Sequence, residues 1–373
     1  MSTMLDTTNI VPRAFGKVEY LDWIKRRAIE PGEVVEWGLA LSGMPDPDPL
    51  LFTEVMKNLP IFGANQTGWK PWIDAISQRY NVPDDCIVAN FGTSQANYLA
   101  IAAVAGPGDN VLVEYPTYEP LIALPQGLGC EVSFIERRRD NNWRLDLDEL
   151  REAVKSDVRL MILANPHNPT GVFYNDEEIR EIAGIVASGG GYLLVDEVYR
   201  EAVPGYWKTT SFGLAKNILI TTSLTKVFGL STLRAGWLIA PPAIAHAASL
   251  VHDRLAGRSP LITEELSARV MNDPVILEQC GLQRHNRLTA NRATMQRVAT
   301  KYHWDVVLPE TSLTVFVKHP QWDSETLVVK ARSHGILVTP GRFFGYNDRV
   351  RIAFTSEPET FERLLNRLAE VLA

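Results

Sequence analysis

The amino-acid sequence predicts an α/β fold with two parts, a large domain built on a mostly parallel sheet flanked by helices and a smaller α+β domain. Between about residues 85 and 240, short apolar runs alternate with amphipathic stretches, as in strands joined by crossover helices. The last third of the chain begins with long helical segments and continues into a short β-rich region. With 373 residues, the chain is long enough for about two domains.

In the first part, four runs rich in Leu, Ile and Val predict strands that are buried on both faces of a parallel sheet. They are residues 110–114, 158–164, 192–195 and 217–221. Helical patterns lie between them, including residues 147–155 and 177–187. Ligands of such sheets bind beyond the carboxyl ends of the strands, so we expect a site there.

In the second part, apolar spacing predicts helices first and strands afterwards. The helices are residues 260–271, 275–300 and 358–372, and the strands are residues 313–318, 336–339 and 350–354. Residues 1–40 have no sheet pattern of their own and need another surface to pack on. We therefore expect a large domain over residues 41–279, and an N-terminal arm plus a small domain over residues 1–40 and 280–373.

Composition excludes several classes of function. There are 37 Lys and Arg against 44 Asp and Glu, with no basic stripe, so we expect no nucleic-acid partner. Cys86, Cys130 and Cys280 are odd in number and form no C-x-x-C pair, which predicts neither disulfides nor a zinc site and fits a reducing cytoplasm. The longest apolar run, residues 98–105, is far shorter than the ~20 residues that span a bilayer, so we expect no membrane insertion.

The segment Asn-Pro-His-Asn-Pro-Thr-Gly, residues 165–171, directly follows the predicted strand that ends at Ala164. Its two prolines prevent continuation of helix or strand, so a rigid loop presents Asn168 at the strand's carboxyl edge. Taken alone, the segment is also explained by an ordinary turn.

A second polar signal follows the next predicted strand, where Asp196 and Tyr199 stand in the sequence Asp-Glu-Val-Tyr. An ionised carboxylate at the end of a buried strand is costly without a cationic partner, so Asp196 needs a positive charge nearby. A helix cap or a metal ligand is the alternative for such an acid.

Lys226 lies in Ser-Leu-Thr-Lys after the strand at 217–221, and Arg234 follows eight residues later. A lysine on such a loop can condense with an aldehyde, while Ser223 and Arg234 can grip a phosphate. Thr93 and Ser94 open a helical stretch, and a helix N-terminus favours anions. Taken alone, Lys226 is also explained as a solvated surface lysine, and Thr93 and Ser94 as an ordinary helix cap.

Together these motifs resemble the class I/II aminotransferases, which are pyridoxal 5'-phosphate (PLP) enzymes of fold type I. The resemblance includes Pro-Gly-Arg-Phe-Phe-Gly at 340–345 and a late arginine, Arg351, and it extends from about Leu41 to the C-terminus. It implies the PLP-dependent transferase-like fold.

The resemblance also implies a role for each matching residue. Lys226 would carry PLP covalently and move the substrate's α-proton, and Asp196 would pair with the pyridine nitrogen. Asn168 and Tyr199 would hydrogen-bond the 3'-oxygen of the ring, and Tyr118 would stack on the ring face.

Phosphate and substrate contacts are implied in the same way. The phosphate would be bound by Thr93, Ser94, Ser223 and Arg234. Arg351 would clamp the α-carboxylate of the substrate with a bidentate fork, and Gly43 would line the substrate pocket. Without the family context, Arg351 reads as an exposed arginine on a strand and Gly43 as a turn glycine.

The function expected from this resemblance is transfer of an amino group between an L-amino acid and a 2-oxo acid. A lyase or cyclase of the same fold, which eliminates, cyclises or decarboxylates a specialised amino acid, is the alternative. A third reading, the effector domain of a PLP-dependent transcription regulator, needs a DNA-binding region, and no helix-turn-helix precedes the PLP pattern.

Relatives also lead us to expect a homodimer with its active sites near the subunit interface. Many relatives place in the partner's site a tyrosine that the stretch 61–68 of this chain lacks, so this contact is either lost or supplied by Asn65 or Gln66. Apolar residues without an evident partner in the chain are candidates for the subunit contact. They are Phe15, Trp23, Trp37, Ile61 and Phe62.

Overall fold

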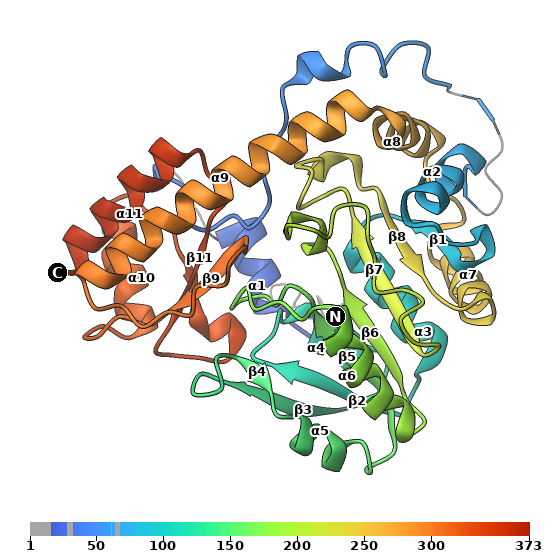
Figure 1. Ribbon diagram of the computed structural model, residues 1–373, viewed down its shortest axis with the longest axis horizontal. Coiled ribbons are helices and arrows are strands. Elements are labelled where there is room, and N and C mark those ends of the chain that lie inside the picture. The colour runs from blue at the N-terminus through green and yellow to red at the C-terminus, as the bar shows by residue number, and fades with distance from the viewer. Residues whose placement is uncertain (1–15, 28–32, 61, 64–67) are drawn as a thin grey trace, which may run out of the picture.

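Two sheets organise the chain, and the larger one holds its strands in the order β1-β8-β7-β6-β5-β2-β3-β4 (Figure 1). The structure is a computed structural model that describes residues 16–27, 33–60, 62–63 and 68–373. Five consecutive strands of the large sheet are parallel to one another, namely β7 (Ile218–Ser223), β6 (Tyr192–Asp196), β5 (Val158–Ala164), β2 (Asn110–Tyr115) and β3 (Glu131–Arg138). The strands predicted within residues 110–221 are therefore confirmed.

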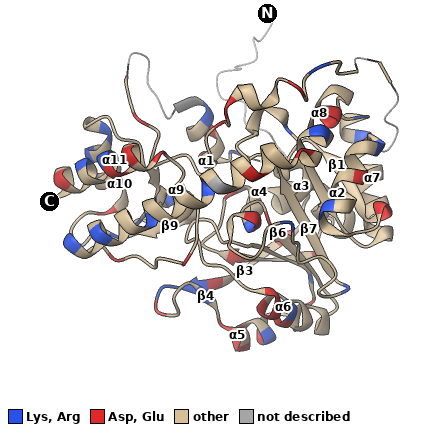
Figure 2. Cartoon of the chain, turned by 45° about the horizontal axis from the view of Figure 1, so that its top comes forward, with Lys and Arg blue, Asp and Glu red and all other residues tan. Residues whose placement is uncertain are grey.

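The edges of the large sheet depart from the parallel pattern. β8 (Gly236–Ile239) is antiparallel to both of its neighbours, β7 and β1 (Ile87–Asn90), and β4 (Arg144–Leu145) is antiparallel to β3. The central strands are buried along almost their whole length, and charged residues lie mostly on the surrounding helices and loops (Figure 2). This distribution explains why the strands appear in the sequence as continuous apolar runs.

Helices pack around the large sheet. They are α2 (Lys70–Tyr80), α3 (Thr93–Val104), α4 (Pro120–Gly127), α5 (Leu147–Ala153), α6 (Asp176–Ser188), α7 (Pro242–Ala256) and α8 (Leu261–Asn272). Helix α6 shows why such a helix forms here. Asn175 caps it by accepting hydrogen bonds from the backbone N–H groups of Glu177 and Glu178, at 2.9 and 3.0 Å. Its buried face carries Ile179, Ile182 and Val186 at helical spacing.

The second sheet is small and antiparallel, in the order β10 (Thr339–Pro340), β11 (Val350–Ala353), β9 (Thr314–Val317). The predicted strand at 336–339 is mostly wrong, because only Thr339 belongs to a strand. Its earlier residues pair instead with the N-terminal part of the chain. The Glu36 N–H donates to Gly335 O at 2.9 Å, and the Glu36 carbonyl oxygen accepts from the Leu337 N–H at 3.1 Å. Such a pairing has no local sequence signal.

Three further helices accompany the small sheet, namely α9 (Pro274–Lys301), α10 (Ser324–Ser333) and α11 (Pro358–Leu372). Helix α9 reaches from α8 to α11 and thus connects the two parts of the chain (Figure 1). The expected boundary after residue 279 falls inside this helix. The division into 41–279 and 1–40 with 280–373 remains our proposal.

The N-terminal segment, defined as residues 16–27, contains α1 (Glu19–Asp22) and one turn of π-helix, Trp23–Arg27. The expectation that Trp23 faces a partner subunit is wrong for the described chain. Trp23 is 8% exposed and packs on Phe343 at a ring distance of 5.3 Å. Trp37 is half-buried and Phe62 is exposed, whereas Phe15, Ile61, Asn65 and Gln66 lie outside the described residues.

All three cysteines are buried and free. Within the described part of the chain, no helix combines the length and the apolar character needed to cross a bilayer.

Candidate active site

A cavity of about 900 Å³ opens at the carboxyl ends of β5, β6 and β7, as the parallel sheet predicts. Ten of the eleven residues singled out in the sequence line it: Gly43, Thr93, Ser94, Tyr118, Asn168, Asp196, Tyr199, Ser223, Lys226 and Arg234. Arg351 lies behind this wall and contacts Asn168. Segments far apart in the sequence thus meet in one place.

One corner of the cavity is an anion cradle at the first turn of α3. Thr93 Oγ1 donates to Ser223 Oγ at 2.9 Å, and Arg234 Nη2 donates to the backbone oxygen of Phe91 at 2.9 Å. Gly92 has φ +98°, and a Cβ there would lie 2.8 Å from Arg234 Nη2. Glycine therefore lets the guanidinium approach the N-terminus of the helix, where N–H groups favour an anion.

Asp196 lies at the floor of the cavity, at the end of β6. Its carboxylate accepts hydrogen bonds from Asn97 Nδ2 at 3.0 Å and from the backbone N–H of Val198 at 3.1 Å. Among the described residues, no cation lies within ion-pair distance of it. Burial raises the pKa of Asp196 to about 6, against the effect of the two hydrogen bonds. The site therefore holds a carboxylate that lacks a cationic partner.

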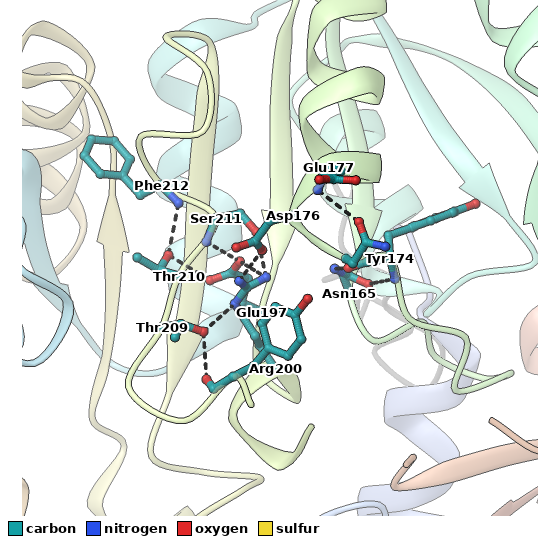
Figure 3. A network of polar contacts seen from close by, with 12 residues as sticks. Asn165, Tyr174, Asp176, Glu177, Glu197, Arg200, Thr209, Thr210, Ser211 and Phe212 are labelled. Atoms are coloured by element: carbon teal, nitrogen blue, oxygen red, sulfur yellow. Dashed lines mark hydrogen bonds and ion pairs between the residues drawn. The ribbon is translucent and has the colours of Figure 1, made fainter. Parts of the chain in front are cut away.

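The next residue, Glu197, anchors the chain behind the cavity (Figure 3). Its carboxylate accepts from the N–H of Ser211 and from Thr210 Oγ1, both at 2.8 Å, and it lies 3.4 Å from Arg200 Nη1. Arg200 Nη2 also donates to Asp176 Oδ1 at 2.6 Å, at the start of α6. This network holds the segment that carries Asp196 and Tyr199.

The Asn168 loop is braced at both ends. Asn165 Oδ1 accepts from the N–H of Tyr174, and Asn165 Nδ2 donates to the oxygen of Tyr174, both at 2.8 Å (Figure 3). His167 is fully buried, with its ring nitrogens 2.7 Å from Thr170 Oγ1 and from Pro116 O. Burial keeps the pKa of His167 well below its usual value, so the ring is neutral and braces the loop by hydrogen bonds.

Arg351 comes from β11 in the small sheet and is fully buried. Its Nη1 donates to Asn168 Oδ1 at 3.2 Å, and its Nη2 donates to the oxygen of Ala40 at 2.8 Å and to Thr339 Oγ1 at 3.1 Å. Its Nε has no hydrogen-bond partner among the described residues. Within the described part of the chain, the guanidinium is thus held by three hydrogen bonds and has two of its five N–H donors unused, on Nε and on Nη1.

Lys226 lies on the loop after β7, opposite Gly43. The backbone N–H of Met44 donates to the oxygen of Lys226 at 2.8 Å, and a Cβ on Gly43 would lie 3.4 Å from Lys226 Cδ. The ammonium group of Lys226 forms no ion pair with any described residue. Because residue 43 is a glycine, no side chain separates its backbone from the side chain of Lys226.

Three residues of the site escaped the sequence analysis. Asn97 binds Asp196, Ser42 accepts a hydrogen bond from the Tyr199 hydroxyl at 2.9 Å, and Tyr20 lines the cavity beside Tyr118 at a ring distance of 5.4 Å. A polar residue within the apolar helix α3 was a usable signal for Asn97. No local signal marks Ser42 or Tyr20, because their roles depend on packing between distant segments.

Comparison with known proteins decides the family, since the family model "Aminotransferase class I and II" matches residues 70–368. The chain belongs to this family. Among curated relatives, it is 29% identical over 299 residues to capreomycidine synthase of Streptomyces vinaceus, covering 78% of this chain and 75% of that protein. It is 24% identical over 317 residues to an aspartate aminotransferase of Streptomyces avermitilis, covering 79% and 76%.

Solved structures of the family share the fold. A PLP-dependent aminotransferase from Streptococcus suis matches with a TM-score of 0.85 at 22% identity, covering 97% of this chain and 98% of that one. The PLP-dependent cyclase OrfR matches with a TM-score of 0.84 at 23% identity, covering 98% and 99%. The fold is therefore the fold type I architecture that the resemblance implies.

The family depends on PLP, and the residues of the cavity fit that cofactor. The anion cradle beside Gly92 and Arg234 suits a phosphate, Lys226 offers an amine to an aldehyde, and the unpaired carboxylate of Asp196 suits a protonated ring nitrogen. The phosphate, the aldehyde and the ring nitrogen of PLP thus each have a complementary group in this cavity.

Proposed function

We propose that this protein is a PLP-dependent aminotransferase that moves an amino group between an L-amino acid and a 2-oxo acid. The observation that carries the proposal is that Lys226, Asp196 and the anion cradle line one cavity. The buried Arg351 contacts Asn168, which lines the same cavity. These groups supply the base, the counter-ion and the anchors that the reaction needs.

Bound PLP supplies an aldehyde that condenses with amines and a protonated ring that withdraws electrons from the substrate's Cα. Lys226 would hold the cofactor through its side-chain amine, and that amine, once released by substrate, would accept the proton from Cα and return one later. Asp196 holds a proton on the ring nitrogen, because an adjacent carboxylate favours the charged form of that nitrogen. Its burial strengthens this effect, because charges interact more strongly where the effective dielectric constant is low.

Four residues anchor the phosphate, namely Thr93, Ser94, Ser223 and Arg234. Tyr118 covers one face of the ring, and burial, with the neighbouring Tyr20, Tyr199 and Asp196, raises the pKa of its phenol so that it stays neutral. Asn168 and Tyr199 would hydrogen-bond the 3'-oxygen. The Tyr199 hydroxyl donates to Ser42 Oγ at 2.9 Å, and it would redirect this single proton to the 3'-oxygen.

Substrate is held by its α-carboxylate. The guanidinium of Arg351 donates to the carboxylate from behind Asn168, which its Nη1 also serves. Gly43 permits close approach of the substrate to the backbone beside Lys226.

A lyase or cyclase reaction on a specialised amino acid is the second candidate, and two specific observations favour it. The relatives include one named capreomycidine synthase and a structure titled as a PLP-dependent cyclase. Such a reaction uses the same lysine, aspartate and arginine. It differs in which bond of the substrate breaks and in the step that follows.

The experiment that separates the two is product analysis of the purified holoenzyme with a panel of L-amino acids and no added 2-oxo acid. An aminotransferase converts one equivalent of amino acid to its 2-oxo acid per active site and then stops. A lyase or cyclase turns over many times and releases a cyclic, eliminated or decarboxylated product. Mass spectrometry of the products, together with the number of turnovers, decides between them.

We further infer a cytoplasmic homodimer. The exposed Phe62 supports the dimer as an apolar residue without a partner among the described residues of the chain, being 86% exposed. Light scattering of the holoenzyme at micromolar concentration tests it, since a monomer with full activity contradicts the inference.

A further inference from the structure

Tyr20 lines the cavity although it lies far outside the matched motifs, on the N-terminal segment. The segment is fastened at this point by Glu119, whose carboxylate accepts hydrogen bonds from the backbone N–H groups of Glu19 at 2.9 Å and Tyr20 at 2.6 Å. The Tyr20 ring packs edge-on against Tyr118 and Phe343 at ring distances of 5.4 and 5.6 Å. Its side chain is therefore held in one place.

The Tyr20 ring also covers the guanidinium of Arg351, whose Cζ lies 5.7 Å from the ring centroid. Tyr20 and Asn168 both line the cavity and both contact Arg351, whereas Arg351 itself is fully buried. A carboxylate that approaches Arg351 from the cavity therefore meets the side chains of Tyr20 and Asn168.

Two positive charges act on the phenol of Tyr20. Burial raises its pKa, but the positive charges of Arg351 and Lys226 outweigh this effect and bring that pKa below its ordinary value. Lys226 lines the same cavity and Arg351 lies behind its Asn168 side, and both cations attract an anion. A neutral phenol has an O–H that it can donate to such an anion.

We propose that Tyr20 is a substrate-binding residue, whose hydroxyl donates a hydrogen bond to the α-carboxylate of the amino acid beside Arg351. The inference rests on the proposed function, because it takes an amino acid as the ligand. It adds a third donor to the two that Arg351 offers, and it makes the N-terminal segment part of the active site. A hydroxyl in this position selects for amino acids over simple amines.

The test compares wild-type holoenzyme with Tyr20→Phe, which removes only the hydroxyl and keeps the ring packing. Calorimetry measures the dissociation constants of the standard L-amino acids and of amines that lack the carboxylate, such as phenylalanine against phenethylamine. A hydrogen bond to a charged group is worth about ten- to a hundred-fold in affinity, so Tyr20→Phe weakens amino acid binding by that factor. Amines bind both proteins within about twofold.

Trp23→Phe is the matched control, because Trp23 is buried on the same segment and does not line the cavity. It leaves both sets of constants within about twofold of wild type. The inference is contradicted if Tyr20→Phe binds amino acids as tightly as wild type or more tightly, or if its affinities for amino acids and amines fall equally. Either result leaves the proposed function standing. If no amino acid binds the wild-type holoenzyme, the proposed function fails, and the inference fails with it.

Discussion

Asp196 and Glu197 are neighbours in the sequence, are both buried, and have opposite surroundings. Glu197 faces Arg200 at 3.4 Å and accepts two further hydrogen bonds, from Thr210 and Ser211. Asp196 faces the cavity, accepts two hydrogen bonds from uncharged donors, and lies beyond ion-pair distance of any cation in the described chain. Burial raises the pKa of both carboxyl groups, even though the charge of Arg200 lowers that of Glu197.

The difference separates a structural carboxylate from a functional one. The chain itself supplies the partners of Glu197, and its network joins β6 to α6 and to the loop at 209–212 (Figure 3). The chain leaves the carboxylate of Asp196 without an ion-pair partner among the described residues, which lowers stability when the group is ionised and no ligand brings a positive charge. Substitutions in the two environments should therefore act on different properties.

The largest effect is expected from Arg200→Leu. Removing one partner of a buried ion pair leaves the charge of Glu197 uncompensated and costs about 3–5 kcal/mol in the free energy of unfolding. Urea unfolding measures this loss. Asp176→Asn is the control, because its carboxylate is 41% exposed and it should cost about 1 kcal/mol or less. Equal losses in the two variants would show that Arg200 acts through Asp176 rather than Glu197.

Asp196→Asn should act on chemistry instead. An amide cannot hold the proton on the ring nitrogen, so the rate of α-proton removal falls about a hundred- to a thousand-fold, while the phosphate contacts retain the cofactor. Exchange of the α-hydrogen in D₂O, followed by NMR, measures this rate, and cofactor content is determined alongside. Glu197→Gln is the matched comparison and should leave the exchange rate within a few-fold. An unchanged rate in Asp196→Asn would make Asp196 structural.

A smaller effect concerns pH and the cofactor-free protein. The pKa of Asp196 is about 6 when folded, against about 3.9 in an unfolded chain. Between these values the folded state binds more protons than the unfolded state, so stability falls as pH rises. From pH 5 to pH 7 this group removes about 1 kcal/mol, and Asp196→Asn abolishes that part of the pH dependence. Parallel pH profiles for the two proteins would contradict the assigned pKa.

The sequence predicted the parallel sheet and most of the cavity because both are encoded locally. Apolar runs marked β2, β5, β6 and β7, and short motifs after the strands marked Asn168, Asp196 and Lys226. What it missed depends on distant contacts. The segment at 336–338 pairs with Glu36, Trp23 is covered by Phe343, and Tyr20 reaches the cavity through Glu119, about a hundred residues away. None of these contacts produces a periodic pattern or a change of composition in the sequence.

The most direct test of the account is to find the lysine that carries the cofactor. Borohydride reduction of the holoenzyme fixes PLP to its lysine, and proteolysis with mass spectrometry then identifies the labelled peptide. We predict a single label on Lys226, and loss of the label in Lys226→Ala, which stays folded and still binds PLP without a covalent bond. A label on any other lysine, or on none, contradicts the assignment of this cavity as the active site.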